Sequence, residues 1–333
     1  MQESIPREMK AVVIDRYGGP EVLHVATLPV PEAKAGQVLV HLAAAGIGVW
    51  DADVRAGEWE IGPRRFPKVI GNDGAGEVVA AGSGVKRVHP GDRVYVYSLD
   101  GGCYAEYVAV EQDRIAPVPG GLKVEAAGAL GADGITALCG LDDTLHLRRG
   151  EKLLIFGASG GIGHLAVQLA KRLEAEVFAV ASGEDGVALV RGLGADQAVD
   201  GKHGAVVDAL HSFAPDGLDA ALVLASGKGR DSALAQVKRG GRIAYPYGVE
   251  PEPEAVKGIT VRGYDGEPNA ERLDRLNELI SRGPFHVEEK LYPLDEAAQA
   301  HRDLEKHHLG KFALRIGRTP PFISEKSSAV GRG

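Results

Sequence analysis

The chain has 333 residues, a length that suggests about two domains, each large enough to bury a hydrophobic core. Apolar residues make up 44% and charged residues 25%, as in an ordinary soluble globular protein, and no apolar run approaches the roughly 20 residues that span a bilayer. The net charge of −8 argues against nucleic acid or an anionic membrane as the main partner, and only two cysteines are present, which excludes a disulfide framework and favours a reducing cytoplasm.

Residues 10–122 have the pattern of a compact β domain. Short strand-like runs are separated by glycine and proline: AVVI (11–14), QVLVHLAAAG (37–46), GEVVAAG (76–82) and DRVYVYS (92–98). Short strands with turn signals at this spacing are typical of a barrel-like β domain.

From about residue 124 to residue 263, strand-like runs alternate with longer helical stretches. The predicted strands are LLIF (153–156), VFAVA (177–181), QAVD (197–200), DAALVLA (219–225), RIAYPY (242–247) and ITVRG (259–263). This alternation predicts an α/β fold with a parallel, doubly wound sheet, whose last strand lies at the edge.

The C-terminal part of the chain adds two helices and one strand. The segments AERLDRLNELISRG (270–283) and LDEAAQAHRDLEKHHLG (294–310) predict amphipathic helices. FALRI (312–316) predicts a final strand that returns to the first domain. The last residues, 319–333, are polar and rich in proline, serine and glycine, and we expect them to be disordered.

The run LLIFGASGGIGHLAVQLAK (153–171) is the clearest functional signal. A strand leads into a turn with glycines at 157, 160 and 163 and then into a helix. Gly157 allows a sharp turn, Gly160 lets backbone approach phosphates, and Gly163 lets helix and strand pack closely. The alternative is a merely structural turn. The predicted cofactor-binding residues of this turn are Gly157, Ala158, Ser159, Gly160, Gly161, Ile162 and Gly163.

The chain resembles the medium-chain dehydrogenase/reductase family, specifically its zinc-free, zeta-crystallin-like quinone oxidoreductase branch. The resemblance covers residues 9–317 and rests on GGPEVL (18–23), GNDGAGEVVAAGSGV (71–85), GDRV (91–94), GGCYAEYV (101–108), GITAL (134–138), GASGGIG (157–163), GGRI (240–243) and LDEAAQAHRDLE…GK (294–311). It implies a GroES-like catalytic domain from residues 1–123 and 264–318, with a Rossmann dinucleotide-binding domain at 124–263. The active cleft then lies between the two domains.

The resemblance raises the question of zinc, which related alcohol dehydrogenases use to polarise a substrate oxygen. The positions that match their ligand pattern are Gly48, Asn72, Asp73 and Ala132, and only Asp73 has a side chain suited to zinc. The family's separate structural zinc requires four clustered cysteines, whereas this chain has only two. We therefore predict that no metal is bound.

The nucleotide preference is argued from charge at the end of the second strand of the doubly wound sheet. NAD sites place an acidic residue there, whereas this chain has Ser182, which favours NADPH over NADH. Glu184 and Asp185 follow at once and would repel a 2′-phosphate. A capping box, with Ser182 as the N-cap and Asp185 at N3, would turn both acids toward their own helix. Lys202 is the candidate for phosphate charge, with a solvated surface lysine as the alternative.

Further cofactor contacts are carried over by position. The resemblance implies that Thr136 lies near the nicotinamide, although a threonine that starts a helix is an equal alternative. Ends of parallel strands line the cofactor crevice. Following this rule, we predict contacts from Leu224, Ala225, Tyr245, Tyr247 and Gly248, and ordinary packing is the alternative for either tyrosine.

The predicted substrate-binding residues are Gly48, Trp50 and Asp53 in the segment IGVWDAD (47–53). Gly48 and Asp53 depart from the family's asparagine and tyrosine, and Trp50 is either an aromatic wall or a packing residue. Asp51 is interpreted as a structural hydrogen-bonding residue, since a carboxylate is deprotonated at pH 7 unless its pKa is shifted. No catalytic residue is assigned. The basic segment PRRFPK (63–68) is a hint of an anionic substrate, with a solvated loop as the alternative.

These observations predict an NADPH-dependent quinone oxidoreductase that acts on a small quinone, enone or enal without zinc. An enoyl-thioester or alkenal reductase and a dinucleotide-binding protein with little catalysis remain as alternatives. Because an edge strand carries unpaired backbone groups, the strand at 259–263 is expected to pair with a second copy in a cytoplasmic homodimer.

Overall fold

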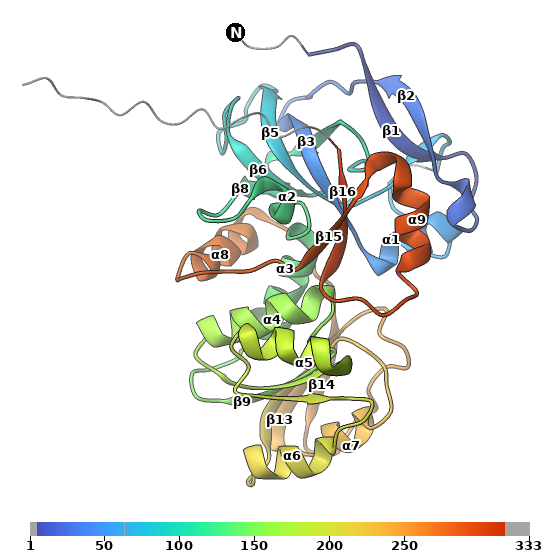
Figure 1. The fold of residues 1–333 in the computed structure, drawn as a ribbon. Helices are drawn as coiled ribbons and strands as arrows, with labels where there is room; N and C mark the ends of the chain where they lie inside the picture. Colours follow the sequence, from blue (N-terminus) through green and yellow to red (C-terminus); the bar gives the residue numbers. More distant parts are fainter. Residues whose placement is uncertain (1–4, 63, 317–333) are drawn as a thin grey trace, which may run out of the picture.

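The computed structural model describes residues 5–62 and 64–316. The predicted tail at 319–333 therefore lies outside the described residues. Both ends of the described chain lie in one half of the molecule and the middle of the chain forms the other half, as Figure 1 shows. We call these the upper and the lower half, after their places in that view.

Antiparallel strands dominate the upper half. One sheet has the order β2-β1-β4 and the other the order β15-β16-β3-β5-β6-β8, with β7 also paired to β3. Their bounds are β1 (Glu8–Ile14), β2 (His24–Pro29), β3 (Gln37–Ile47), β4 (Lys68–Val69), β5 (Asp73–Ala81), β6 (Arg93–Tyr97), β7 (Tyr107–Glu111), β8 (Ile115–Pro117), β15 (Glu289–Pro293) and β16 (Lys311–Arg315). The four strands predicted in this region are confirmed as β1, β3, β5 and β6.

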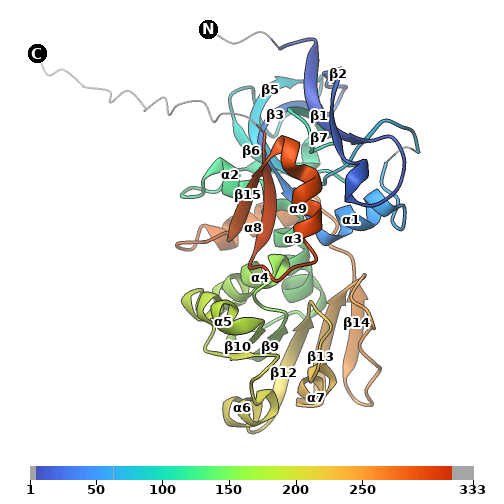
Figure 2. The ribbon, with the colours of Figure 1, turned by 45° about the vertical axis from the view of Figure 1, so that its right-hand side comes forward.

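The lower half is a parallel sheet with the order β11-β10-β9-β12-β13-β14, so the predicted doubly wound sheet is confirmed. Its strands are β9 (Lys152–Phe156), β10 (Glu176–Ala181), β11 (Gln197–Asp200), β12 (Leu218–Val223), β13 (Val237–Pro246) and β14 (Thr260–Tyr264). The accompanying helices are α4 (Gly161–Arg172), α5 (Gly183–Gly192), α6 (Val206–Phe213) and α7 (Arg230–Leu234). β14 lies at the edge of the sheet, as expected (Figure 2).

Strand β9 shows why these strands are continuous apolar runs. Successive side chains of a strand point to opposite faces, and a parallel sheet is covered on both. Leu153 and Ile155 are buried in one core with Leu165 of α4, whereas Leu154 and Phe156 are buried in another together with residues of α6 and α7. The two cores fix the strand that leads into the glycine turn.

The C-terminal strand returns to the upper half, as predicted. β16 pairs antiparallel with β3, with Leu314 opposite Ala45, and pairs parallel with β15. The second predicted helix is shorter than expected, because 294–296 form a 3₁₀ turn (η4) and the helix α9 comprises only Ala297–Asp303. The chain then crosses to the glycine turn, where the N–H of Gly310 donates to the oxygen of Ser159 at 2.9 Å.

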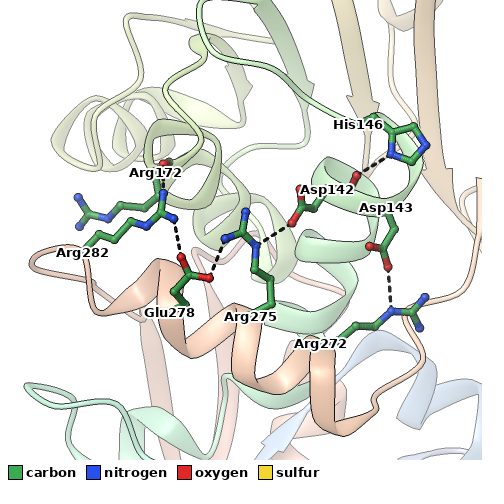
Figure 3. A network of polar contacts seen from close by, with 8 residues as sticks. All are labelled: Asp142, Asp143, His146, Arg172, Arg272, Arg275, Glu278 and Arg282. Carbon is green, nitrogen blue, oxygen red and sulfur yellow. Dashed lines mark hydrogen bonds and ion pairs between the residues drawn. The ribbon is translucent and has the colours of Figure 1, made fainter.

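The remaining helices lie between strands of the upper half or on the segments that link the two halves. They are α1 (Val49–Ala56), α2 (Val124–Ala127), α3 (Gly131–Leu138), which continues as a π-helical segment (Cys139–Thr144), and α8 (Ala270–Ile280). Arg272 and Arg275 of α8 bind Asp143 and Asp142 of the π-helical segment at 2.8 and 2.9 Å, and Arg275 also binds Glu278 (Figure 3). These ion pairs join α8 to the segment that leads into the parallel sheet.

Candidate active site

The glycine turn has the geometry that the sequence predicts. Gly157 follows β9 with φ +91°, a backbone conformation that favours glycine. Gly160 is the N-cap of α4, and a Cβ built there would meet nothing closer than 3.7 Å, so its backbone faces open space. A Cβ on Gly163 would instead overlap the oxygen of Gly157. The turn therefore presents the N-terminus of α4 to a cleft, as a diphosphate site requires.

The cleft runs between this turn and the end of β3 with helix α1. It contains a cavity of about 590 Å³ and a smaller one of about 180 Å³. Val49, Trp50, Ile162 and Leu224 line both, so the two cavities adjoin. The small cavity lies on the glycine turn, and the large one extends away from it over Thr136 and the ends of β12 and β13.

Most of the predicted site residues line this cleft. Those on the small cavity are Gly48, Trp50, Gly157, Gly160, Gly161, Ile162, Gly163 and Leu224. Those on the large cavity are Trp50, Asp53, Thr136, Ile162, Leu224, Ala225, Tyr247 and Gly248. Gly48 is required here for steric reasons, because a Cβ would overlap the Trp50 ring.

Three predicted residues lie near the cleft without lining either cavity. Ala158 is fully buried, and Ser159 is buried with its Oγ accepting the Ser182 N–H at 3.1 Å. Tyr245 is buried against the back of the sheet, and its hydroxyl donates to Glu252 at 2.8 Å. Of the two tyrosine candidates, only Tyr247 reaches the cavity.

The turn after β10 differs from the predicted capping box. Ser182 is the N-cap residue of α5, but its side chain makes no capping hydrogen bond, so that prediction is wrong. Asp185 instead binds His307 at 3.1 Å, because the segment after α9 brings an imidazole across from the upper half. Neither Ser182 nor the exposed Lys202 lines either cavity.

Asp200, at the end of β11, holds this turn in place. Its carboxylate accepts the N–H groups of Lys202 at 3.0 Å and Gly183 at 3.1 Å and contacts the His203 ring at 2.9 Å. These hydrogen bonds, with that from Lys202 the largest, lower the pKa of Asp200 to about 2. Asp200 therefore carries a negative charge beside the turn after β10 and fixes the backbone of that turn.

A buried ion cluster lies under the glycine turn. The ammonium of Lys311 binds the carboxylate of Asp73 and lies 3.1 Å from Oδ1 of Asp133, and all three side chains are at most 4% exposed. Burial raises the pKa of both carboxyls, and the Lys311 charge opposes that shift. Burial alone would lower the pKa of Lys311, but the two carboxylates hold it above its usual value.

The four positions that match zinc ligands offer few donors for a metal. Asp73 accepts the Ala132 N–H with one oxygen and binds Lys311 with the other, so each of its oxygens already has a partner. Asn72 donates its amide to the oxygen of Ser98 at 2.5 Å, and Gly48 offers no side chain. Zinc needs three or four thiolate, imidazole or carboxylate donors. In residues 5–62 and 64–316, no cluster of three such side chains is placed to hold a metal.

A second buried polar network lies behind α1, and the sequence indicated only part of it. Asp51 accepts the Gly48 N–H at 2.8 Å and the Tyr104 hydroxyl at 3.0 Å. Tyr104 also contacts His301, whose other ring nitrogen accepts from Arg55 at 2.9 Å. Burial raises the pKa of Asp51 to about 7 and lowers that of His301 to about 3. Asp51 is thus a hydrogen-bonding residue that holds the N-terminus of α1.

Comparison with known protein families gives matches in both halves. Residues 34–120 match the alcohol dehydrogenase GroES-like domain, and residues 161–264 match the domain named zinc-binding dehydrogenase. A quinone oxidoreductase of Mus musculus is 30% identical, covering 92% of this chain and 97% of its own. An NADPH-dependent alkenal/one oxidoreductase of Arabidopsis thaliana is 35% identical, covering 92% and 78%.

Solved structures share the whole fold. An NAD-dependent alcohol dehydrogenase superposes with a TM-score of 0.83 at 31% identity, covering 93% of this chain and 100% of the other. A mycobacterial protein complexed with NADPH superposes with a TM-score of 0.79 at 27% identity, covering 92% and 99%. No helix in the described part of the chain is long and apolar enough to cross a membrane. The chain belongs to the medium-chain dehydrogenase/reductase family, as a quinone oxidoreductase-like oxidoreductase.

Proposed function

We propose that this protein transfers a hydride from NADPH to a quinone, or to the activated alkene of an enone or enal, without zinc. The observation that carries the proposal is the cleft, where the glycine turn adjoins a cavity of about 590 Å³ whose lining combines apolar and aromatic side chains with carboxylates. The positions that hold zinc in related enzymes carry a glycine, an amide, an alanine and an aspartate already bound to lysine.

Bound NADPH supplies the hydride, and the chain's own residues orient and shield it. The free N–H groups at the start of α4 bind the diphosphate. Thr136, Leu224 and Ala225 line the large cavity, where they position the nicotinamide end. Trp50 and Trp59 give the acceptor a flat apolar wall, which excludes water. A quinone accepts hydride readily, and its reduced anion takes a proton from solvent, so no acidic side chain is required.

The proposal of NADPH over NADH is supported by the turn after β10. Ser182 supplies no negative charge there, and Asp185 is engaged by His307 rather than free to repel a phosphate. The negative charge of Asp200 at this turn opposes the preference, although its carboxylate is already bonded by the N–H groups of Lys202 and Gly183 and by His203. The Arabidopsis relative is NADPH-dependent by name, whereas one structural neighbour is an NAD-dependent alcohol dehydrogenase. Titrating both reduced cofactors tests this preference, and tighter binding of NADH contradicts it.

Reduction of alkenals and enones is the second candidate. The Arabidopsis relative favours it, at 35% identity the higher of the two sequence matches. The enoyl-thioester alternative rested on the basic segment 63–68, of which residues 64–68 are described. There Arg64 forms an ion pair with Glu60, and Lys68 is 6% exposed, so the segment offers less free positive charge than its sequence implies. A binding protein with little catalysis is the remaining alternative.

The test is NADPH oxidation at 340 nm with a panel of 1,4-quinones, enals, enones and crotonyl thioesters. We expect turnover with quinones or enones that persists in EDTA, in protein without stoichiometric zinc by elemental analysis. Turnover restricted to thioesters, or activity that depends on added zinc, contradicts the proposal. Tight NADPH binding without turnover on any acceptor favours the binding-protein alternative.

We also propose the domain boundaries and the assembly expected from the sequence. The catalytic domain comprises residues 1–123 and 264–318, and the dinucleotide-binding domain comprises residues 124–263. The position of β14 at the edge of the parallel sheet supports a homodimer that pairs this strand with its counterpart. The low cysteine content supports a cytoplasmic location.

A further inference from the structure

The large cavity has an uneven distribution of charge. Five carboxylate residues line it, from both sides of the cleft: Asp53 and Glu60 follow β3, and Glu250, Asp265 and Glu267 follow β13 and β14. Its described lining includes no lysine, arginine or histidine. The two opposite walls of the cavity thus both carry negative charge.

Little of this negative charge is neutralised nearby. Glu60 forms an ion pair with Arg64, which is 75% exposed. Within residues 5–62 and 64–316, no ion pair involves Asp53, Glu250, Asp265 or Glu267. Like charges lining a cleft with low-dielectric walls reinforce one another's potential. The cavity therefore carries a negative potential at neutral pH.

A second observation, independent of the carboxylates, also points to a ligand that donates hydrogen bonds. Asn72 lines the same cavity and is 4% exposed. Its amide nitrogen donates to Ser98, but its Oδ1 finds no donor among the described residues. A buried acceptor without a partner is unfavourable, so a ligand that donates an N–H or O–H to it is favoured over one that only accepts.

Aromatic side chains complete the recognition surface. Trp50, Trp59, Tyr97, Tyr247 and Tyr264 all line the cavity. Aromatic faces attract a cation through the ring quadrupole, and they stack on a flat neutral ring. An anionic group gains no such attraction from these faces and is repelled by the carboxylates.

We propose that this cavity selects the hydride acceptor by charge, binding cationic ring acceptors most tightly, neutral ones next and anionic ones, including coenzyme A thioesters, weakly. This inference rests on the proposed function, because it takes the cavity as the acceptor site. Glu250, Asp265 and Glu267 are the specificity-determining residues, since each lines the cavity, is exposed and forms no ion pair within the described part of the chain.

The chain offers a direct binding measurement. It has two tryptophans, Trp50 and Trp59, and both line the cavity, so quenching of intrinsic fluorescence by a quinone reports occupancy of this site. The probes are three 1,4-naphthoquinones: one neutral, one with a sulfonate and one with a trimethylammonium side chain. They are titrated with NADP⁺ present, which prevents turnover.

At about 20 mM salt we expect the cationic probe to bind at least about tenfold more tightly than the anionic probe, equivalent to about 1.4 kcal/mol. High salt shortens the screening length to about 3 Å at 1 M, so the ratio should fall toward one. The variant Glu250→Gln/Asp265→Asn/Glu267→Gln should lower the ratio below about threefold. The matched control Glu32→Gln/Asp216→Asn/Glu296→Gln removes the same charge from exposed positions outside the cavity and should keep the ratio.

Equal dissociation constants for the three probes, or a ratio that the rim variant leaves unchanged, overturn the inference. NADPH oxidation with the neutral quinone is measured in parallel. Its absence, together with the expected order of dissociation constants, overturns the proposed function while supporting selection by charge. NADPH oxidation together with equal dissociation constants for the three probes overturns only the proposed selection by charge.

Discussion

Lys311 and Asp133 form a buried ion pair, with 3.1 Å between Nζ and Oδ1, that joins the last strand of the upper half to helix α3. Asp73 completes the cluster from β5. Helix α3 leads into the parallel sheet, and Asp133 also lies against Gly161 at the start of α4. The Lys311 ammonium therefore joins the two halves and lies beneath the glycine turn.

The variant Lys311→Met is expected to lower the free energy of unfolding by about 3–5 kcal/mol, because two buried carboxylates lose their countercharge. Urea denaturation measures the change. The control Lys306→Met removes an ammonium that is 69% exposed and paired with Asp303, and should cost at most about 1 kcal/mol. Adding Asp73→Asn and Asp133→Asn to Lys311→Met should restore part of the loss. Equal effects of the two lysine variants would contradict a structural role for the cluster.

The variant Gly163→Ala tests the glycine turn. Its Cβ would overlap the oxygen of Gly157, so helix α4 must move away from β9 and its N–H groups must leave the diphosphate position. We expect NADPH affinity to fall at least about tenfold, or about 1.4 kcal/mol, measured by nicotinamide fluorescence. Gly192→Ala is the control, because it lies in α5 with open space around its Cβ and should bind NADPH as the native chain does.

Asp51 predicts a pH dependence of stability. Burial raises its pKa in the folded state to about 7, above that of an unfolded aspartate near 3.9, so the folded protein binds the proton more tightly. Stability from this group is complete below about pH 4 and is lost as the pH rises to about 7. His301 has the opposite sign, since its folded pKa is lowered to about 3.

The comparison between the native chain and Asp51→Asn isolates the Asp51 contribution. An asparagine still accepts from Gly48 and Tyr104 but does not titrate. The native chain should therefore lose stability relative to the variant between pH 4 and pH 7, by a few kcal/mol at about 1.36 kcal/mol per pKa unit. Urea midpoints at several pH values measure this difference. A constant difference across the range would show that Asp51 stays ionised.

Lys202 tests the cofactor preference. Lys202→Ala is expected to weaken NADPH binding by several-fold and to leave NADH binding unchanged, because only NADPH carries the 2′-phosphate. The effect is small since the side chain is exposed and screened. Lys86→Ala, an exposed lysine of the upper half, is the control for loss of one charge. Equal weakening of both cofactors would place Lys202 outside the phosphate contact.

The sequence predicts the elements of this fold because each strand and helix has its own periodic pattern. QAVD (197–200) corresponds residue for residue to β11, and the run at 153–156 lies within β9. The glycine turn is equally predictable, because the positive φ of Gly157 and the close contact of Gly163 with the Gly157 oxygen are local requirements of the turn. A tertiary contact overrides the local pattern at Asp185. In sequence this residue fits a capping box, but its carboxylate binds His307, more than a hundred residues later.

The polar clusters of the site are not predictable in this way. Asp73, Asp133 and Lys311 lie on three separate elements, and nothing local to any of them indicates that they meet. His301 reaches Tyr104 only because α9 folds back against the upper half. The only sequence feature that includes Lys311 is the GK pair at 310–311. This pair matches the family pattern, but it does not predict an ion pair.

The proposed homodimer depends on the outer edge of β14. The backbone oxygens of Tyr264 and Gly258 accept hydrogen bonds from Tyr247 and Gly240. The even-numbered residues of β14 therefore direct their backbone groups toward β13. Val261 is odd-numbered, so its N–H points away from β13 and from the sheet. Val261→Pro removes one outward donor and leaves the ladder with β13 intact, whereas Val261→Thr keeps the donor. We expect a dimer for the native chain and for Val261→Thr, and a monomer for Val261→Pro, by light scattering at micromolar concentration. A native monomer contradicts the homodimer, and a dimeric Val261→Pro places the interface elsewhere.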